Sequence, residues 1–262
     1  MKEYRVVKMH SEELGREVSI YIMLPQSYFK SEKFYPVLYM HDGQNIFDGL
    51  GSYHGESWGI LEAYEEHPDL PEVVIIGIEN GGKARSDELV PFSFYFKDVK
   101  EAEYANVSFG GKTNDYLGFI INVVKPYIDK TFRTYKSPKN TGIMGSSFGG
   151  VCSTYAALQY TSHFSRFGFL SNAYFVVQKE METLAKNTDL SDVKRLYMDV
   201  GTKEGSSSTE RLSYVESNQR IYNILKEKMP RSRIRFDIVE DAKHNEPEWE
   251  KRFPDIIRFL FN

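Results

Sequence analysis

Short apolar runs alternate with segments of helical periodicity along most of the chain. Two runs of alternating hydrophobic and polar residues come first, at 4–9 and 17–24, and predict an antiparallel hairpin. Six further apolar runs follow. Several are nearly continuous, as expected for strands that are covered on both faces. They are YPVLYM (35–40), EVVIIGI (72–78), NTGIMG (140–145), RFGFLS (166–171), RLYMDVG (195–201) and RIRFDIV (233–239).

Apolar residues recur at helical spacing in four segments, 114–132, 149–164, 208–229 and 246–261. In the first of them, Pro126 predicts a kink or a break, because proline lacks the amide hydrogen that a helix interior needs. Strands that alternate with helices after a leading hairpin predict an α/β fold. We therefore expect one domain over 1–262, with a mostly parallel central sheet, an antiparallel N-terminal hairpin and helices on both faces.

Residues 80–113 show no clean period and are rich in glycine and charge. A loop of that length in a compact domain is usually functional or disordered. The aromatic residues Phe94, Tyr95, Phe96 and Phe109 are more than a disordered segment would carry. We interpret the segment as a lid or pocket wall.

Composition excludes several classes of partner. The net charge is −4 and no run of four or more Lys or Arg occurs, which argues against nucleic acid or an anionic membrane surface. No stretch approaches the length of a membrane span, and the N-terminal residues lack the apolar core of a signal peptide. Cys152 is the single cysteine, so a reducing, cytoplasmic setting is expected.

The stretch NTGIMGSSFGG (140–150) contains the pattern G-x-S-x-G, with Ser147 at its centre. In this motif a serine sits on a sharp turn between a strand and a helix, and the flanking glycines avoid collisions with both. An apolar run precedes the pattern and a helix of small residues follows it, which is the context that the motif requires. We predict that Ser147 is a nucleophile; the alternative is a polar turn or a helix-capping serine.

A serine hydroxyl needs a base. Of the six histidines, His244 follows the last predicted strand and precedes the last predicted helix, where a chain with the order nucleophile, acid, base would place it. The loop RLYMDVGTKEG offers two acids, Glu204 just past the strand and Asp199 within it. We favour Glu204, and Asp199 and Asp241 stay open as alternatives.

Acyl transfer also needs backbone N–H donors for the developing oxyanion. Phe148, after the nucleophile, would supply one donor, and Gln44 in the loop YMHDGQN would supply the other. In the same loop His41 and Asp42, together with Asp48, could instead be metal ligands, but their spacing supports this only weakly and we expect no metal. We assign substrate contacts to His41 and Asp42 in this loop, and to Arg85 and Tyr95 in segment 80–113.

Several stretches together resemble the esterase D/enterochelin esterase-like branch of the α/β-hydrolases. They follow the family order from about residue 18 to the C-terminus: PVLYMHDGQNIFD, GIENGGKARSDELVP, NDYLGFIINVVKPYIDKTFRT, TGIMGSSFGG, DVGTKEG and AKHNEPEWEKRFPDIIRFL. The resemblance implies an α/β-hydrolase fold and hydrolysis of esters or thioesters without a cofactor. It implies Ser147, His244 and Glu204 as the catalytic residues and Gln44 and Phe148 as oxyanion donors. Where such families carry Asp as the acid, this chain has Glu.

We therefore predict a serine esterase that acts on a small-molecule ester, such as a siderophore lactone or a phenolic or short acyl ester. The alternatives are an acyltransferase that uses the same acyl-enzyme and a catalytically inactive binding module. The sequence shows no Lys or Arg cluster for a strongly anionic ligand, apart from Lys83 and Arg85 in segment 80–113.

Overall fold

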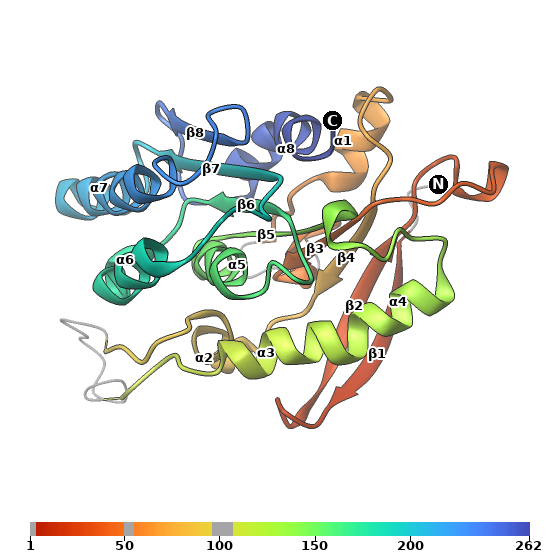
Figure 1. Ribbon diagram of the computed structural model, residues 1–262, viewed down its shortest axis with the longest axis horizontal. Coiled ribbons are helices and arrows are strands. Elements are labelled where there is room, and N and C mark those ends of the chain that lie inside the picture. The colour runs from red at the N-terminus through yellow and green to blue at the C-terminus, as the bar shows by residue number, and fades with distance from the viewer. Residues whose placement is uncertain (1–3, 50–54, 96–106) are drawn as a thin grey trace.

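The computed structural model describes residues 4–49, 55–95 and 107–262. In this part of the chain eight strands form one sheet in the order β1-β2-β4-β3-β5-β6-β7-β8 (Figure 1). The pairs β1–β2 and β2–β4 are antiparallel, and every pair from β4 to β8 is parallel. The predicted fold class is thereby confirmed. The strands are β1 (Arg5–Ser11), β2 (Arg16–Met23), β3 (Val37–His41), β4 (Val74–Ile78), β5 (Thr141–Ser146), β6 (Arg166–Leu170), β7 (Arg195–Gly201) and β8 (Ile234–Val239).

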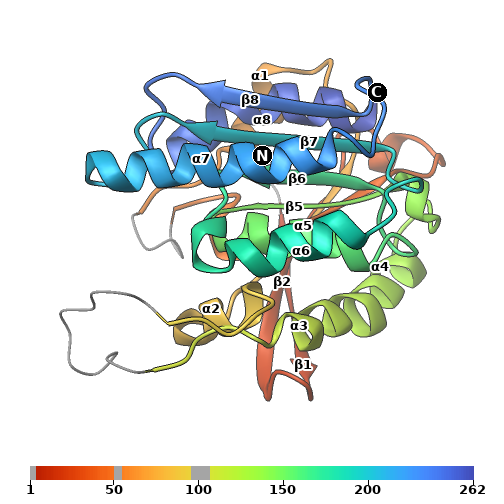
Figure 2. The same ribbon diagram turned by 60° about the vertical axis from the view of Figure 1, so that its left-hand side comes forward.

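Helices cover both faces of the sheet (Figure 2). One face packs against α1 and α8, and the other against α2 to α7, so that each face has its own apolar cluster. The helices are α1 (Ile60–Glu66), α2 (Arg85–Leu89), α3 (Thr113–Phe119), α4 (Lys125–Thr131), α5 (Phe148–Gln159), α6 (Gln178–Asn187), α7 (Ser208–Leu225) and α8 (Glu246–Phe261). Short helical turns are η1 (Tyr28–Lys30), η2 (Gly43–Asn45), η3 (Gly82–Ala84), η5 (Ile120–Val124), η6 (Pro138–Asn140) and η7 (Tyr174–Val176).

The continuous apolar runs reflect this covering of both faces. Along β3, Val37 and Tyr39 join the cluster under α3 and α5, whereas Leu38 and Met40 join the cluster under α8. Successive side chains of a strand point to opposite faces, so a strand buried on both sides needs apolar residues at every position. The apolar run of β3 ends at His41, whose side chain lies on the α3 and α5 side of the sheet.

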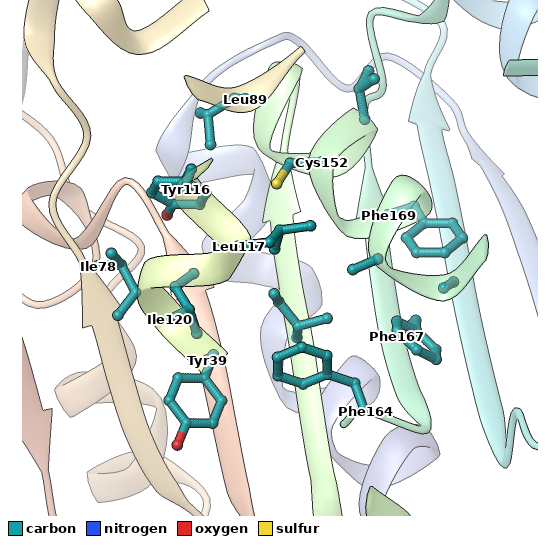
Figure 3. Packing of buried hydrophobic residues seen from close by; sticks show 14 of the residues in the cluster. Tyr39, Ile78, Leu89, Tyr116, Leu117, Ile120, Cys152, Phe164, Phe167 and Phe169 are labelled. Atoms are coloured by element: carbon teal, nitrogen blue, oxygen red, sulfur yellow. The ribbon is translucent and has the colours of Figure 1, made fainter. Parts of the chain in front are cut away.

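The helical segment around Pro126 does not break. Residues 113–131 are helical throughout, but Ile120–Val124 form a π-helical turn that ends two residues before the proline. A π turn widens the helix, and such turns occur where the regular hydrogen-bond ladder is disturbed. The predicted kink therefore takes the form of a local widening. Tyr116, Leu117 and Ile120 are still buried in the core, and Leu117 points toward α5, which carries Cys152 (Figure 3).

Two helices and part of segment 80–113 were not predicted. Helix α6 buries only Met181 and Ala185, one turn apart, and α1 has only seven residues, so neither carries a long apolar period. Segment 80–113 begins with η3 and α2, and an isolated bridge joins Phe94 to Phe109. The expectation of an irregular loop was wrong for this described part, and Phe96 lies outside the described residues. No helix among the described residues is long and apolar enough to cross a membrane.

Candidate active site

Ser147 sits on a strained turn between β5 and α5. Its backbone has φ 58° and ψ −122°, a combination that residues with a side chain rarely adopt. The amide of Ser147 donates to the carbonyl of Leu170 in the neighbouring strand β6 at 2.9 Å, which fixes the turn to the sheet. The serine is therefore lifted out of the strand at the carboxyl edge of the sheet, directly before the first turn of α5.

The glycines of the motif are required by the close approach of His41. A Cβ atom on Gly145 would lie 2.8 Å from Cδ2 of His41, and one on Gly149 would lie 3.2 Å from Cβ of His41. Contacts this short force a neighbour to move, and His41 cannot move because it is buried in the core. The G-x-S-x-G pattern thus lets strand, turn and helix pack around one imidazole ring.

His41 was predicted to contact substrate, and the structure corrects this. The side chain is 3% exposed, and its two ring nitrogens face protein hydroxyls, Tyr116 at 2.9 Å and Ser153 at 3.1 Å. Burial lowers the pKa of His41 to about 4, so the ring is neutral at pH 7. It ties β3 to α3 and α5 and has no nitrogen left for a substrate.

His244 contacts a buried carboxylate. Nδ1 of His244 lies 2.6 Å from Oε2 of Glu204, and the Glu204 side chain is fully buried. The second oxygen of Glu204 accepts hydrogen bonds from the hydroxyl of Ser171 and from the amide of Gly201, each at 2.5 Å. Of the three candidate acids, the structure thus brings Glu204 to the imidazole.

The other two candidates have different partners. Asp199 lies in β7, with Oδ2 2.8 Å from Nε of Arg252. Burial, offset in part by the charge of Arg252, raises the pKa of Asp199 to about 6, and the nearby Glu204 adds to the rise. Asp241 is an exposed residue paired with Lys203 at 2.6 Å. Asp199 acts on the site indirectly, because its backbone carbonyl accepts from the amide of Ser171 at 3.0 Å.

Ser171 is held by donors on two sides. Its hydroxyl accepts from Nε1 of Trp249 at 2.8 Å and from Nη2 of Arg252 at 3.3 Å. Both lone pairs of the hydroxyl are then occupied, so its hydrogen is directed to Glu204. Trp249 also packs edge-on against His244, with ring centroids 5.2 Å apart. Trp249 of α8 therefore contacts both the imidazole and the hydroxyl that holds the carboxylate.

Tyr214 of α7 links the serine and the histidine. The side chain of Ser147 is close enough to the Tyr214 hydroxyl to lower its pKa slightly, and the Tyr214 ring lies 5.0 Å from that of His244. Burial raises the pKa of Tyr214, so its hydroxyl keeps its proton at neutral pH. Sequence reasoning missed this residue. Its segment was read as an ordinary amphipathic helix, and no local motif marks the tyrosine.

The loop after β3 runs beside the first turn of α5. A Cβ atom on Gly149 would lie 3.4 Å from Oδ2 of Asp42, and β3 and β5 are parallel neighbours, so their carboxyl ends meet here. This arrangement brings η2, with Gln44, and the amide of Phe148 to one edge of the sheet. The side chain of Gln44 accepts from the amide of Asn80 at 3.3 Å, which anchors the loop to the end of β4.

Asp42 and Arg85 form a bidentate pair. Nε and Nη2 of Arg85 donate to the two carboxylate oxygens of Asp42 at 2.6 and 2.8 Å, and Asn80 donates to the first of them at 2.6 Å. Burial raises the pKa of Asp42, but the charge and hydrogen bonds of Arg85 outweigh it and hold the pKa below its usual value. Asp42, predicted to contact substrate, instead positions Arg85.

The remaining predicted residues lie farther out. The guanidinium of Arg85 lies 5.7 Å from the ring centroid of Phe148, the residue after Ser147. Arg85 is therefore near the serine turn, and its contact with substrate stays a prediction. Tyr95 is 63% exposed and remains a candidate in the segment before the undescribed residues. The alternative of a metal held by His41, Asp42 and Asp48 finds no support, because these side chains bond to Tyr116, Arg85 and Tyr4. Among the described residues no cluster of His, Cys, Asp and Glu could hold a metal ion.

A mostly parallel sheet with a strained serine at the carboxyl edge, and a histidine on a buried carboxylate in later loops, defines an α/β-hydrolase. The sequence profile of the family described as Putative esterase matches residues 11–260, and the chain belongs to that family. It is a carboxylic ester hydrolase, as the sequence predicted.

Three known proteins illustrate the similarity. YbbA, an uncharacterized protein of Bacillus subtilis (strain 168), is 28% identical over 254 residues, 94% of this chain and 93% of YbbA. An IroE-like serine hydrolase from Shewanella oneidensis has the same fold, with a TM-score of 0.76 and 21% identity over 98% of this chain and 80% of that one. The enterobactin esterase FES from Shigella flexneri superimposes with a TM-score of 0.71 and 17% identity, over 98% of this chain and 58% of that one.

Proposed function

We propose that the protein hydrolyses small-molecule esters through an acyl-enzyme on Ser147, with His244 as the base and Glu204 as the acid. The contact of 2.6 Å between Glu204 and Nδ1 of His244 carries this proposal. A carboxylate only accepts hydrogen bonds, so it favours the tautomer with the proton on Nδ1. The other nitrogen, Nε2, is then free of its proton and able to take one from a serine.

The reaction would proceed in two halves. Oγ of Ser147 attacks the carbonyl carbon while Nε2 of His244 takes the hydroxyl proton, and the imidazolium then protonates the leaving alcohol as the C–O bond breaks. Water repeats the sequence on the acyl-enzyme and releases the acid. The amides of Gln44 and Phe148 would hold the oxyanion in both halves; one such donor typically accounts for about 3 kcal/mol of the barrier.

Tyr214 belongs to this proposal as a positioning residue. Its protonated hydroxyl, which lies close to Ser147 and to the ring of His244, would hold the serine side chain beside the imidazole. The range of substrates stays open between siderophore lactones, phenolic esters and short acyl esters. Solved structures with this fold include proteins described as an enterobactin esterase and a ferulic acid esterase. A cytoplasmic location also stays a prediction.

An acyltransferase would use the same acyl-enzyme with an alcohol in place of water. Product partition in the presence of added alcohol distinguishes the two, because a transferase forms the new ester in excess of the free acid. The inactive binding module that the sequence left open is not supported, since the chain belongs to a family of ester hydrolases.

The decisive experiment compares wild type with Ser147→Ala, His244→Ala and Ser146→Ala on p-nitrophenyl acetate and butyrate. Ser146 is the matched control, because it neighbours the nucleophile but is the last residue of β5. Turnover should disappear in the first two variants and persist in the third. If Ser147→Ala kept the wild-type rate, or if a fluorophosphonate left no adduct on the wild type, the proposed mechanism would be wrong.

A further inference from the structure

A pocket of about 640 Å³ opens beside His244. Its walls come from the loop after β7, the loop after β8, the first turn of α7 and Glu56. This volume is in the range that holds a small molecule. The pocket is therefore the place where a substrate part that touches His244 would lie.

Three cationic side chains line this pocket, Lys203, Arg211 and Lys243, and Glu56 is the one carboxylate among the lining residues. These cations are separated by 8 and 32 residues in the sequence, so the cluster forms only in the fold. The sequence had indicated no such cluster, and the structure corrects that expectation.

The charges of Arg211 and Lys243 are available for a ligand. Lys203 is paired with Asp241 at 2.6 Å, but Arg211 and Lys243 form no ion pair within residues 4–49, 55–95 and 107–262. Nε of Arg211 donates to the carbonyl of Gly205 at 3.3 Å, which leaves the two terminal nitrogens of its guanidinium to form a fork. The nearby Glu210 carboxylate accepts from the amides of Ser206 and Ser207 as part of the helix cap, which occupies it.

We propose that this pocket binds an anionic group, a carboxylate or a phosphate, carried by the alcohol half of the ester. The proposal rests on the proposed function, in which His244 protonates the leaving alcohol. The alcohol half then lies against His244, and the anion it carries reaches the guanidinium and the ammonium groups. A forked guanidinium matches the paired oxygens of a carboxylate and those of a phosphate, so the pocket suits either anion.

Matched esters test the assignment. The probes are 3-(butyryloxy)benzoate and 3-(butyryloxy)benzamide, which share the acyl group and differ in the charge of the phenol. Their kcat/KM values are measured from the release of the phenol. A third probe, 3-(butyryloxy)phenyl phosphate, separates phosphate from carboxylate preference. A separate pair of esters, p-nitrophenyl hemisuccinate and p-nitrophenyl butyrate, differs in the charge of the acyl half and tests whether the anion belongs there instead.

The wild type should prefer the anionic phenyl esters by about tenfold, and this preference should shrink between about 20 and about 500 mM NaCl, because salt screens exposed charges. It should show no comparable gain with the hemisuccinate. Arg211→Gln and Lys243→Gln should each lower the ratio of anionic to neutral rates roughly threefold, a size typical of partly exposed ion pairs. The rate on the neutral benzamide should stay the same in both.

Lys226→Gln is the matched control, since it removes the same charge about 22 Å along the helix axis from Arg211. It should leave the ratio unchanged. Equal rates of the wild type on the benzoate and benzamide esters would overturn the anion site while the esterase proposal stands. A gain confined to the hemisuccinate would overturn the assignment to the alcohol half. Hydrolysis of none of the esters, with no fluorophosphonate adduct on Ser147, would overturn both proposals.

Discussion

Replacing Glu204 by Gln should abolish most of the activity by reversing the tautomer of His244. One oxygen of Glu204 receives two donors, the hydroxyl of Ser171 and the amide of Gly201. An amide nitrogen cannot accept either of them. The oxygen of the new Gln must therefore stay on that side, which turns its NH₂ group toward Nδ1 of His244.

The donor now facing Nδ1 requires that nitrogen to be an acceptor, so the ring proton moves to Nε2. An imidazole with its proton on Nε2 cannot take the proton of Ser147. The same tautomer error in a serine protease, brought about by the corresponding acid-to-amide change, lowers kcat about 10⁴-fold. We expect a loss of that order for Glu204→Gln, with the fold retained, because the replacement is isosteric.

The assay is kcat on p-nitrophenyl butyrate, with circular dichroism as the check on folding and proton NMR as the check on the tautomer. The wild type should show a downfield resonance for the Nδ1 proton that is absent from Glu204→Gln. Asp241→Asn is the control, since it alters the rival acid, which is exposed and paired with Lys203. The reasoning fails if folded Glu204→Gln keeps more than about a tenth of wild-type kcat, or if Asp241→Asn loses as much.

Three further predictions concern residues that surround Ser147 and Glu204. Tyr214→Phe should slow the reaction of Ser147 with a fluorophosphonate roughly fivefold, because the hydroxyl that we propose to position Ser147 is lost; a rate equal to or above wild type would contradict the positioning role. The pKa of His41 falls from 6.5 unfolded to about 4 folded, so the unfolded state binds more protons between these values. Stability should therefore fall by roughly 3 kcal/mol as the pH drops from about 6.5 to about 4. Urea unfolding checks this, and His41→Gln should flatten the pH dependence; parallel curves would argue against it. Asp199→Asn should lower the free energy of unfolding by about 3 kcal/mol, because it leaves the buried guanidinium of Arg252 without its partner. Adding Arg252→Met should restore much of this loss, and a single variant as stable as wild type would contradict the prediction.

The sheet could be predicted because its signal is local. Every predicted strand is present, since burial on both faces demands unbroken apolar runs such as VLYM in β3. The serine turn is equally local: Gly145 and Gly149 stand where a side chain would strike His41. In both cases the residues that respond to the constraint are adjacent in the sequence, although at the serine turn the constraint itself comes from the distant His41, and a short pattern is therefore enough to recognise them.

The functions of polar residues were harder to predict, because they depend on contacts across the fold. His41, which we predicted to contact substrate, is the last residue of β3 and stands directly before a polar loop. Its partners Tyr116 and Ser153 lie 75 and 112 residues away, and they place it in the core. Tyr214 likewise lies in a helix whose pattern is ordinary, and only the packing of α7 brings it to Ser147.

The presence of Glu at the proposed acid position shows how local and distant constraints meet at one residue. Glu204 follows β7 by three residues, and one of its oxygens folds back to the amide of Gly201 at the end of that strand. The other oxygen spans to His244, which comes from the loop after β8. An Asp at this position would be shorter by one methylene, about 1.5 Å. With its backbone unmoved it could not keep both contacts, each of which is already a short hydrogen bond. The longer side chain therefore follows from the position of the loop: it lets one carboxylate close the turn after β7 and hold the imidazole of the next loop.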